Sequence, residues 1–339
     1  MKLALKILFS FVLSIVSYSV SAQSKQVKQI DSLMQNAFNK GFFNGNVLVA
    51  KNNKIIYNSA FGFTDVTKSK KLNTDDRFHI GSITKEFSAV ALMQLQEKGK
   101  LNINDKISKF LQDFPAWANE VSIKNLLQYT SGLPSPNFKM IKNDQDIFDG
   151  LKNIEKLDFK AGTQYDYSNS NFFLRQFIVE KITGLNFKTY AEKFIFKPCK
   201  METAIMTPIN TENKIAKGFN KDGIADKPEP PITGGTYVTT TDLFNWEKCL
   251  QNNKIVNQKS VFVLGQHFDK EDTQSALGEA KYENGKLIQH SHDGRAGSYE
   301  ALLVSDVKEK TTIILLGNNY HGKLFEITDE IKAILKKRK

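Results

Sequence analysis

Strand-like runs stand near both ends of the chain with helical patterns between them, and this order limits the fold more than any single motif. Apolar, β-favouring runs cover residues 46–50 and 54–57, and two more cover residues 301–304 and 311–316. Only a short polar turn separates the first two runs, so antiparallel pairing is expected. The order predicts an α+β fold, an α/β sandwich, in which helices flank one antiparallel sheet built from both chain ends.

Helical spacing dominates the middle of the chain. A buried helix is predicted from Ser82 to about Lys98, where Gly99 suits a left-handed C-terminal position. Apolar periodicity predicts other helices over residues 26–42, 102–114, 122–127, 148–154, 171–183, 190–196 and 325–335, and one that begins near Asp242. A short strand is predicted over residues 236–239 and a hairpin over residues 281–288. Because no repeat or linker divides the sequence, residues 23–339 are predicted to form one domain with a mostly helical insert at roughly 100–215.

The first 22 residues have the pattern of an export signal. Lys2 and Lys6 form a short basic region, an apolar run covers residues 7–20, and small residues end at Ala22. A transmembrane anchor is the alternative, but the run is short, interrupted by serines and followed at once by polar residues, which favours cleavage. We therefore expect residues 1–22 to be a signal peptide. The mature chain is then periplasmic or secreted and has no stable membrane anchor.

Charge and cysteine content exclude few functions. The net charge of +11 comes from lysines that are scattered and often neighbour acidic residues, as on a solvated surface. No basic cluster or nucleic-acid-binding motif accompanies this charge, so no nucleic-acid partner is expected. Cys199 and Cys249, the only cysteines, can pair in an oxidising compartment or remain as two buried thiols, and the sequence leaves both readings open.

A candidate nucleophile, Ser82, stands where the buried helix begins, in the sequence Gly81-Ser82-Ile83-Thr84-Lys85. Residues three apart lie on one helical face, so Ser82 and Lys85 are predicted to meet. A lysine can activate a serine only when burial lowers its pKa from about 10.4 toward neutrality. The structural alternative is that Ser82 only caps the helix. A second Ser-x-x-Lys, Ser305 to Lys308, lies between two predicted strands and is interpreted as an exposed turn.

Two later stretches carry further candidate groups. In the first, the phenol of Tyr167 can exchange a proton with a serine hydroxyl when nearby cations depress its pKa, and the amide of Asn169 can orient a substrate. In the second, His292-Asp293-Gly294-Arg295 precedes a predicted strand, and its glycine would let a substrate backbone approach the strand edge.

Both stretches also have plain structural interpretations. Tyr-x-Asn recurs at Tyr282 in the predicted hairpin, and His292 can be an ordinary surface histidine. His290 and His292 would face the same side of a strand, an arrangement that suits two metal ligands. No third ligand cluster is apparent in the sequence. We therefore predict no metal site and no other cofactor.

Together, the three stretches resemble the motifs of the serine beta-lactamase and penicillin-binding protein superfamily. The resemblance is to its class C-like branch, which also contains D-aminopeptidases, D-alanyl-D-alanine carboxypeptidases and esterases. It runs from about Gly45 to Gly317. Other stretches similar to family signatures are residues 99–105, Leu126-Leu127 with residues 130–134, and Gly234-Gly235 with Thr239, Asp242 and Leu243.

The resemblance implies a role for each candidate residue. Ser82 would be acylated, and two neighbours would share the proton transfers, so the implied catalytic residues are Ser82, Lys85 and Tyr167. The implied substrate-binding residues are Asn169, His292, Gly294 and Arg295. The backbone N–H groups of Ser82 and Arg295 would form the oxyanion hole.

Two departures from the family pattern bear on the substrate. The third motif is His-Asp-Gly rather than Lys-Thr-Gly, and a histidine with a pKa of about 6.5 is mostly neutral at pH 7. Tyr129 stands where the family usually has histidine, and residues 135–137 lack the amide-binding glutamine of class C lactamases. These departures favour a peptidase or esterase on small amides, esters or peptides over a beta-lactamase or D-alanyl-D-alanine carboxypeptidase. The alternative of another class is a non-catalytic protein that binds cell-wall fragments.

Overall fold

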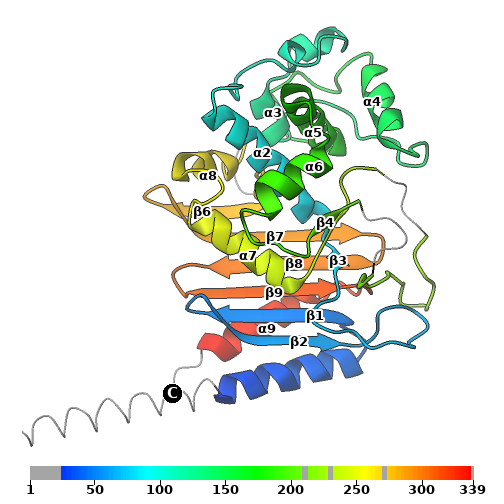
Figure 1. Cartoon of the computed structure of the whole chain (residues 1–339), viewed down its shortest axis with the longest axis vertical. Coiled ribbons are helices and arrows are strands. Elements are labelled where there is room, and N and C mark those ends of the chain that lie inside the picture. The colour runs from blue at the N-terminus through cyan, green and yellow to red at the C-terminus, as the bar shows by residue number, and fades with distance from the viewer. Residues whose placement is uncertain (1–23, 208–212, 228–231, 269–272, 337–339) are drawn as a thin grey trace, which may run out of the picture.

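A six-stranded antiparallel sheet lies at the centre of the fold, in the order β2-β1-β9-β8-β7-β6 (Figure 1). Its strands come from both ends of the chain: β1 (Gly45–Lys51), β2 (Lys54–Phe61), β6 (Glu279–Glu283), β7 (Lys286–Ala296), β8 (Tyr299–Asp306) and β9 (Thr311–Gly317). The first and last of these pair along their whole lengths, from Gly45 opposite Gly317 to Lys51 opposite Thr311. The structure thus confirms the predicted α+β fold and the sheet built from both chain ends.

The computed structural model describes residues 24–207, 213–227, 232–268 and 273–336. The predicted signal peptide at residues 1–22 lies outside these ranges. Among the described helices, none combines the length and the apolar character that a bilayer crossing requires.

The two faces of the sheet bury two separate apolar clusters. Along β1, Val47 and Val49 join a cluster with the N-terminal helix (residues 24–39) and α9 (Leu324–Lys336). Leu48 and Ala50 face the other way, toward the larger cluster that contains the remaining helices. Figure 1 shows α7 (Thr240–Gln251) in front of the sheet and α9 behind it. Because β1 is covered on both faces, its sequence is an apolar run rather than an alternating one.

Further helices contribute to the larger cluster and stand above the β6 edge of the sheet (Figure 1). They are α2 (Lys85–Glu97), α3 (Ile123–Leu127), α4 (Asp144–Lys152), α5 (Asn169–Thr183), α6 (Phe187–Ala191) and α8 (Gln258–Leu264). A second, three-stranded sheet has the order β3-β5-β4 and comprises β3 (Phe78–His79), β4 (Ile205–Met206) and β5 (Thr236–Val238). Gly99 has φ +66°, so the predicted left-handed end of the helix is confirmed.

Two predicted helices differ from the structure. Residues 102–114 contain only a 3-10 turn, Ile107–Lys109. Their apolar side chains do recur at helical spacing, but the Ile107 N–H donates to the Val121 carbonyl at 2.9 Å and so joins a neighbouring segment. The helix predicted over residues 190–196 is α6 followed by a π-helical turn, Glu192–Phe196. At residues 102–114, contact with a neighbouring segment outweighs local periodicity, whereas residues 190–196 are helical with a change of helix type.

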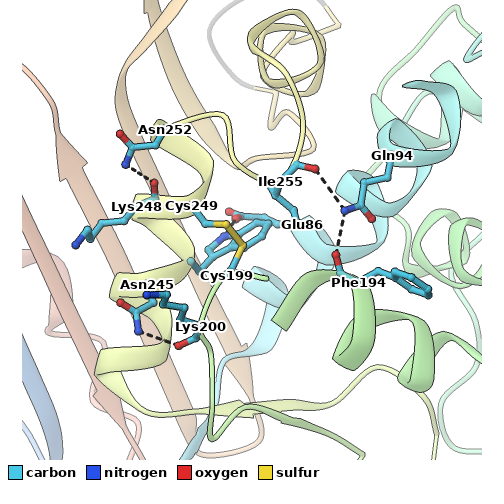
Figure 2. The surroundings of a disulfide bond; sticks show 11 residues. Glu86, Gln94, Phe194, Cys199, Lys200, Asn245, Lys248, Cys249, Asn252 and Ile255 are labelled. Atoms are coloured by element: carbon cyan, nitrogen blue, oxygen red, sulfur yellow. Dashed lines mark hydrogen bonds between the residues drawn. A yellow bond between two sulfur atoms is a disulfide. The ribbon is translucent and has the colours of Figure 1, made fainter. Parts of the chain in front are cut away.

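A disulfide joins Cys199 to Cys249 (Figure 2). Cys249 lies on α7, which covers the sheet, and Cys199 follows the π-helical turn of the helical region. Of the two readings that the sequence leaves open, the structure has the paired one. The bond ties the helical region to the helix that rests on the sheet.

Candidate active site

Ser82 lies in a single 3-10 turn, Gly81–Thr84, which leads directly into α2. The chain enters this turn from β3, and the Gly81 N–H donates to Nδ1 of His79 at 2.8 Å. Gly81 has φ +53°, a left-handed conformation that glycine adopts without strain. Local geometry therefore fixes the backbone on which Ser82 stands, and the helix that follows is buried from Lys85 to Met93.

Two donors converge on the Ser82 hydroxyl. The Lys85 ammonium Nζ donates to Oγ at 3.1 Å, and the Tyr167 hydroxyl donates to the same oxygen at 2.8 Å. Lys85 Nζ also lies 5.1 Å from the centroid of the Tyr167 ring. The structure thus brings together the three residues whose catalytic roles the resemblance implies. Either neighbour, once deprotonated, is within reach of the serine proton.

The buried position of Lys85 favours its role as the base. Burial lowers the pKa of Lys85 to about 8, with a further decrease from Arg175 and an opposing increase from Tyr129. Burial raises the pKa of Tyr167, although its bond to Ser82 and the nearby Arg175 oppose that rise. An amine with a pKa near 8 has an appreciable neutral fraction close to neutral pH, whereas a phenol with a raised pKa does not.

The third motif lies directly against the turn that carries Ser82. A Cβ added at Gly294 would stand 2.9 Å from the Ser82 backbone nitrogen, and one added at Gly81 would stand 2.3 Å from the Arg295 nitrogen. Strand β7 can approach the turn this closely because both positions are glycine. The backbone nitrogens of Ser82 and Arg295 consequently belong to two abutting segments, as an oxyanion hole requires.

The other two predicted binding side chains are placed less directly. The Arg295 guanidinium stacks on Tyr320, with Cζ 3.8 Å from the ring centroid, so this residue offers the site its backbone rather than its charge. Asn169 is half-buried at the first position of α5. Within the described residues, no hydrogen bond joins its side chain to Lys85.

His292 is buried rather than presented on the surface, with 3% of its area exposed. Its Nδ1 donates to Oε1 of Glu86 at 2.6 Å. The same carboxylate oxygen accepts from Nε2 of His290 at 2.9 Å, and Trp246 Nε1 donates to the other Glu86 oxygen at 2.6 Å. Glu86 follows Lys85 on α2, so this carboxylate links the helix that follows Ser82 to strand β7.

His290 stands between two carboxylates. Its Nδ1 lies 2.6 Å from Oε2 of Glu247, opposite the bond to Glu86, so both ring nitrogens donate and the ring is an imidazolium. Burial alone would lower the pKa of His290, but Glu86 and Glu247 together raise it well above its ordinary value. Burial alone would likewise raise the pKa of Glu86, and the two histidines instead hold it well below its ordinary value. The network is a buried ion cluster in which one imidazolium lies between two carboxylates.

Glu86 supplies the third metal-type ligand that the sequence did not reveal beside His290 and His292. One ligand atom from each residue lies within 4.8 Å of the others. The contacts of 2.6 and 2.9 Å between them are hydrogen-bond lengths, whereas the ligands of a tetrahedral zinc ion stand roughly 3.3 Å apart. We therefore describe this cluster as a hydrogen-bonded network, and the expectation of no metal stays a prediction.

The second Ser-x-x-Lys does not form a comparable site. Ser305 is a buried residue of β8 whose hydroxyl accepts from Gln251 Nε2 at 2.6 Å, so its interpretation as part of an exposed turn is wrong. Lys308 is exposed and pairs with Glu283 at 2.9 Å.

Sequence reasoning missed two charged residues close to the site. Glu86 and Arg175 are both fully buried. Glu86 stands in the predicted buried helix after Ser82, and Arg175 stands in the helix predicted over residues 171–183. The available signal was a lone charged residue in an otherwise apolar helical run, which is costly to bury unless it has a partner or a task.

Comparisons with known proteins agree on one family. The Beta-lactamase family model matches residues 29–335. The protein flp of Staphylococcus aureus strain MW2 is 28% identical over 325 residues, which cover 88% of this chain and 65% of flp. Penicillin-binding protein 4* of Bacillus subtilis strain 168 is 28% identical over 356 residues, which cover 91% of this chain and 74% of that protein. The chain thus spans less than two thirds of the length of flp.

Solved structures show the same fold. A penicillin binding protein from Bacillus halodurans superposes with a TM-score of 0.79 at 22% identity, covering 90% of this chain and 98% of that one. A class C beta-lactamase superposes with a TM-score of 0.80 at 21% identity, covering 94% and 98%. With the family model matched over nearly the whole chain, this protein belongs to the Beta-lactamase family, within the serine beta-lactamase and penicillin-binding protein superfamily.

Proposed function

We propose that this protein is an exported serine hydrolase that cleaves small amides or esters through an acyl-enzyme on Ser82, as a peptidase or esterase. The observation that carries the proposal is the Ser82 hydroxyl held by Lys85 at 3.1 Å and by Tyr167 at 2.8 Å. A binding protein needs no buried amine and phenol around one hydroxyl. A nucleophilic serine needs both a base and a proton donor.

The proposed reaction begins when unprotonated Lys85 takes the Ser82 proton and Oγ attacks the substrate carbonyl. The backbone N–H groups of Ser82 and Arg295 stabilise the oxyanion. Tyr167 donates a proton to the departing amine or alcohol and regains one from Lys85. A water molecule then attacks the acyl carbon, its proton returns to the Ser82 oxygen, and the acid product leaves.

The charges at the third motif argue against a substrate carboxylate as the main recognition group. The His292 ring is buried in the Glu86 network, and the Arg295 guanidinium stacks on Tyr320. Asp293, between them, is exposed. Burial raises the pKa of Tyr167, and the Asp293 carboxylate acts on that phenol and adds to the rise. A carboxylate there repels the acid group of a beta-lactam or of a C-terminal D-alanine. Neutral or amine-bearing substrates meet no such penalty.

Export is supported by the disulfide between Cys199 and Cys249. Disulfides persist in oxidising compartments such as the periplasm or the extracellular medium. This agrees with the signal-peptide pattern of residues 1–22. The proposed partners are therefore small amides, esters or peptides outside the cytoplasm.

The proposal is tested with a substrate panel of p-nitrophenyl esters, D-amino-acid p-nitroanilides and nitrocefin, run on the wild type and on Ser82→Ala. We expect turnover of esters or amides that Ser82→Ala abolishes, with nitrocefin the poorest substrate. Preferential turnover of nitrocefin would instead identify a beta-lactamase. No Ser82-dependent turnover, together with muropeptide binding that Ser82→Ala leaves unchanged, would identify a binding protein and overturn the proposal.

A further inference from the structure

Arg175 is a cation buried beneath the proposed catalytic residues. It lies on α5 with none of its surface exposed. Its Nη2 makes a long contact of 3.5 Å with the Tyr129 hydroxyl, and its Nε and Nη1 atoms have no hydrogen-bond partner. Among the described residues, no carboxylate pairs with it. A buried charge without a counter-ion destabilises the fold. A functional role would account for the presence of Arg175 at this position.

A chain of contacts links this cation to the nucleophile. The guanidinium carbon lies 5.5 Å from the centroid of the Tyr129 ring, and the Tyr129 and Tyr167 ring centroids are 4.7 Å apart. Lys85 Nζ lies 5.1 Å from the Tyr167 centroid. The two cationic side chains therefore each contact one of two neighbouring phenol rings, and the Tyr167 hydroxyl bonds to Ser82.

We propose that Arg175 is a positioning residue: its buried charge favours the unprotonated form of Lys85, the form that can accept the proton of Ser82. This inference rests on the proposed function of Ser82 as a nucleophile. A guanidinium stays protonated at every pH at which the enzyme works, whereas an amine can release its proton. In a dry interior the two cations repel, and the amine relieves that repulsion by becoming neutral.

Tyr129 opposes the effect on Lys85, but only as a phenolate, and burial raises the pKa of Tyr129 so that the phenol is neutral near pH 7. The titratable groups that act on the amine and the two phenols are Arg175 on α5, His79 on β3, Tyr129, Tyr165 and Tyr167 in loops, and Asp293 on β7. Burial, aided by Lys85, lowers the pKa of His79 to about 4, so that ring is neutral near pH 7. Asp293 carries the only carboxylate of this set, and on Tyr167 its effect is smaller than the opposing effect of Arg175.

Tyr129 contacts both the Arg175 guanidinium and the Tyr167 ring, and so connects Arg175 to the site. Its hydroxyl is the hydrogen-bond partner that the guanidinium has within the described part of the chain, and Tyr129 is 1% exposed. Burial raises the pKa of Tyr129, and Arg175 opposes that rise. Arg175 also opposes the rise in the pKa of Tyr167 and adds to the decrease for Lys85. One cation therefore shifts all three proton-carrying groups toward their deprotonated forms.

The test replaces the charge and keeps the volume, with Arg175→Met as the variant. Gln176→Met is the matched control, because Gln176 is the next residue of α5, is equally buried and also has a donor without a partner. Two quantities are measured from about pH 6 to 10. One is kcat/KM for p-nitrophenyl acetate, and the other is the ¹³Cε shift of Lys85, which reports protonation without catalysis.

For Arg175→Met we expect the rise of kcat/KM and the Lys85 titration to move together to higher pH by about one unit. The rate at pH 7 then falls about tenfold and recovers near pH 10, while Gln176→Met keeps the wild-type profile. An equal loss at every pH, or an unmoved Lys85 titration, would show a merely structural role and overturn the inference. If Arg175→Met does not fold, Arg175→Gln serves with the same readouts. Absence of Ser82-dependent turnover in the wild type would defeat only the proposed function, because the titration still tests Arg175.

Discussion

At the scale of single residues, the proposed reactivity of Ser82 depends on the protonation states of Lys85 and Tyr167. Ser82 receives hydrogen bonds from Lys85 and from Tyr167, and it can attack only when one of these gives up a proton and takes its own. Burial lowers the pKa of Lys85 to about 8 but raises that of Tyr167. The amine is consequently the better base and the phenol the better acid.

Removal of either proton carrier should reduce turnover. We expect Lys85→Ala and Tyr167→Phe each to lower kcat by about 10²-fold or more while the fold is retained, as judged by circular dichroism.

In the wild type, kcat/KM should rise as the pH increases through about 8, because only the neutral amine accepts a proton. A profile that is flat between about pH 6 and 9 would exclude Lys85 as the base.

Substitution of Asp293 tests whether its carboxylate disfavours substrates that carry an acid group. Asp293→Thr removes a negative charge beside the nucleophile, so acylation by carboxylate-bearing penicillins should become about tenfold faster, a change of about 1.4 kcal/mol. Asp293→Glu keeps the charge and is the matched control. Rates are followed by stopped-flow with a fluorescent penicillin. Equal rates in all three proteins would show that Asp293 does not repel this group.

At the scale of elements, the site depends on how α2 is fixed to β7. The helix carries Ser82's partner Lys85 and, next to it, Glu86, whose carboxylate holds His290 and His292 of the strand. The glycines at positions 81 and 294 permit the close backbone approach that these bonds secure. The buried ion cluster therefore orients the two halves of the proposed oxyanion hole relative to each other.

Breaking the cluster should destabilise the whole fold. Glu86→Gln replaces the carboxylate that accepts from His290, His292 and Trp246 with a neutral amide, so we expect the free energy of unfolding to fall by about 3–5 kcal/mol in urea titrations. Glu283→Gln, in an exposed pair with Lys308, should change it by less than about 1 kcal/mol. Similar small losses in both variants would mean that the buried cluster contributes little.

The same cluster gives stability a dependence on pH. Because the folded-state pKa of His290 is raised, its contribution is fully present below the unfolded pKa of about 6.5 and is lost as the pH rises through the folded value. The deficit of a His290→Asn variant relative to the wild type should accordingly be larger at about pH 6 than at pH 10. A deficit that grows with pH would have the wrong sign.

At the scale of the whole molecule, local patterns were readable from the sequence and distant partners were not. Strand β1 and the meeting of Ser82 with Lys85 follow from spacings of a few residues. The bond between Glu86 and His290 joins residues 204 positions apart, and no local period encodes it. The helix predicted over residues 102–114 is wrong for the same reason. The Val121 carbonyl accepts the Ile107 N–H, which a longer helix would have used. Arg175 was hidden because apolar periodicity does not say what a buried charge faces.

The disulfide cross-links the helical region to α7, the helix that covers the sheet. It closes a loop with a sequence separation of 50, for which chain entropy predicts a stabilisation of about 4 kcal/mol. The double variant Cys199→Ser, Cys249→Ser should therefore unfold at a lower temperature and more readily in urea, with near-normal turnover when folded. An unchanged free energy of unfolding would mean that the packing of α7 alone holds the two parts together.

Covalent labelling decides whether Ser82 is a nucleophile. The folded protein is treated with a fluorophosphonate probe, digested and mapped by mass spectrometry. We expect a single adduct on Ser82, formed faster at about pH 9 than at pH 6 and absent from Ser82→Ala and after heat denaturation. No adduct in the folded protein, or an adduct on another serine such as Ser305, would contradict a Ser82 acyl-enzyme.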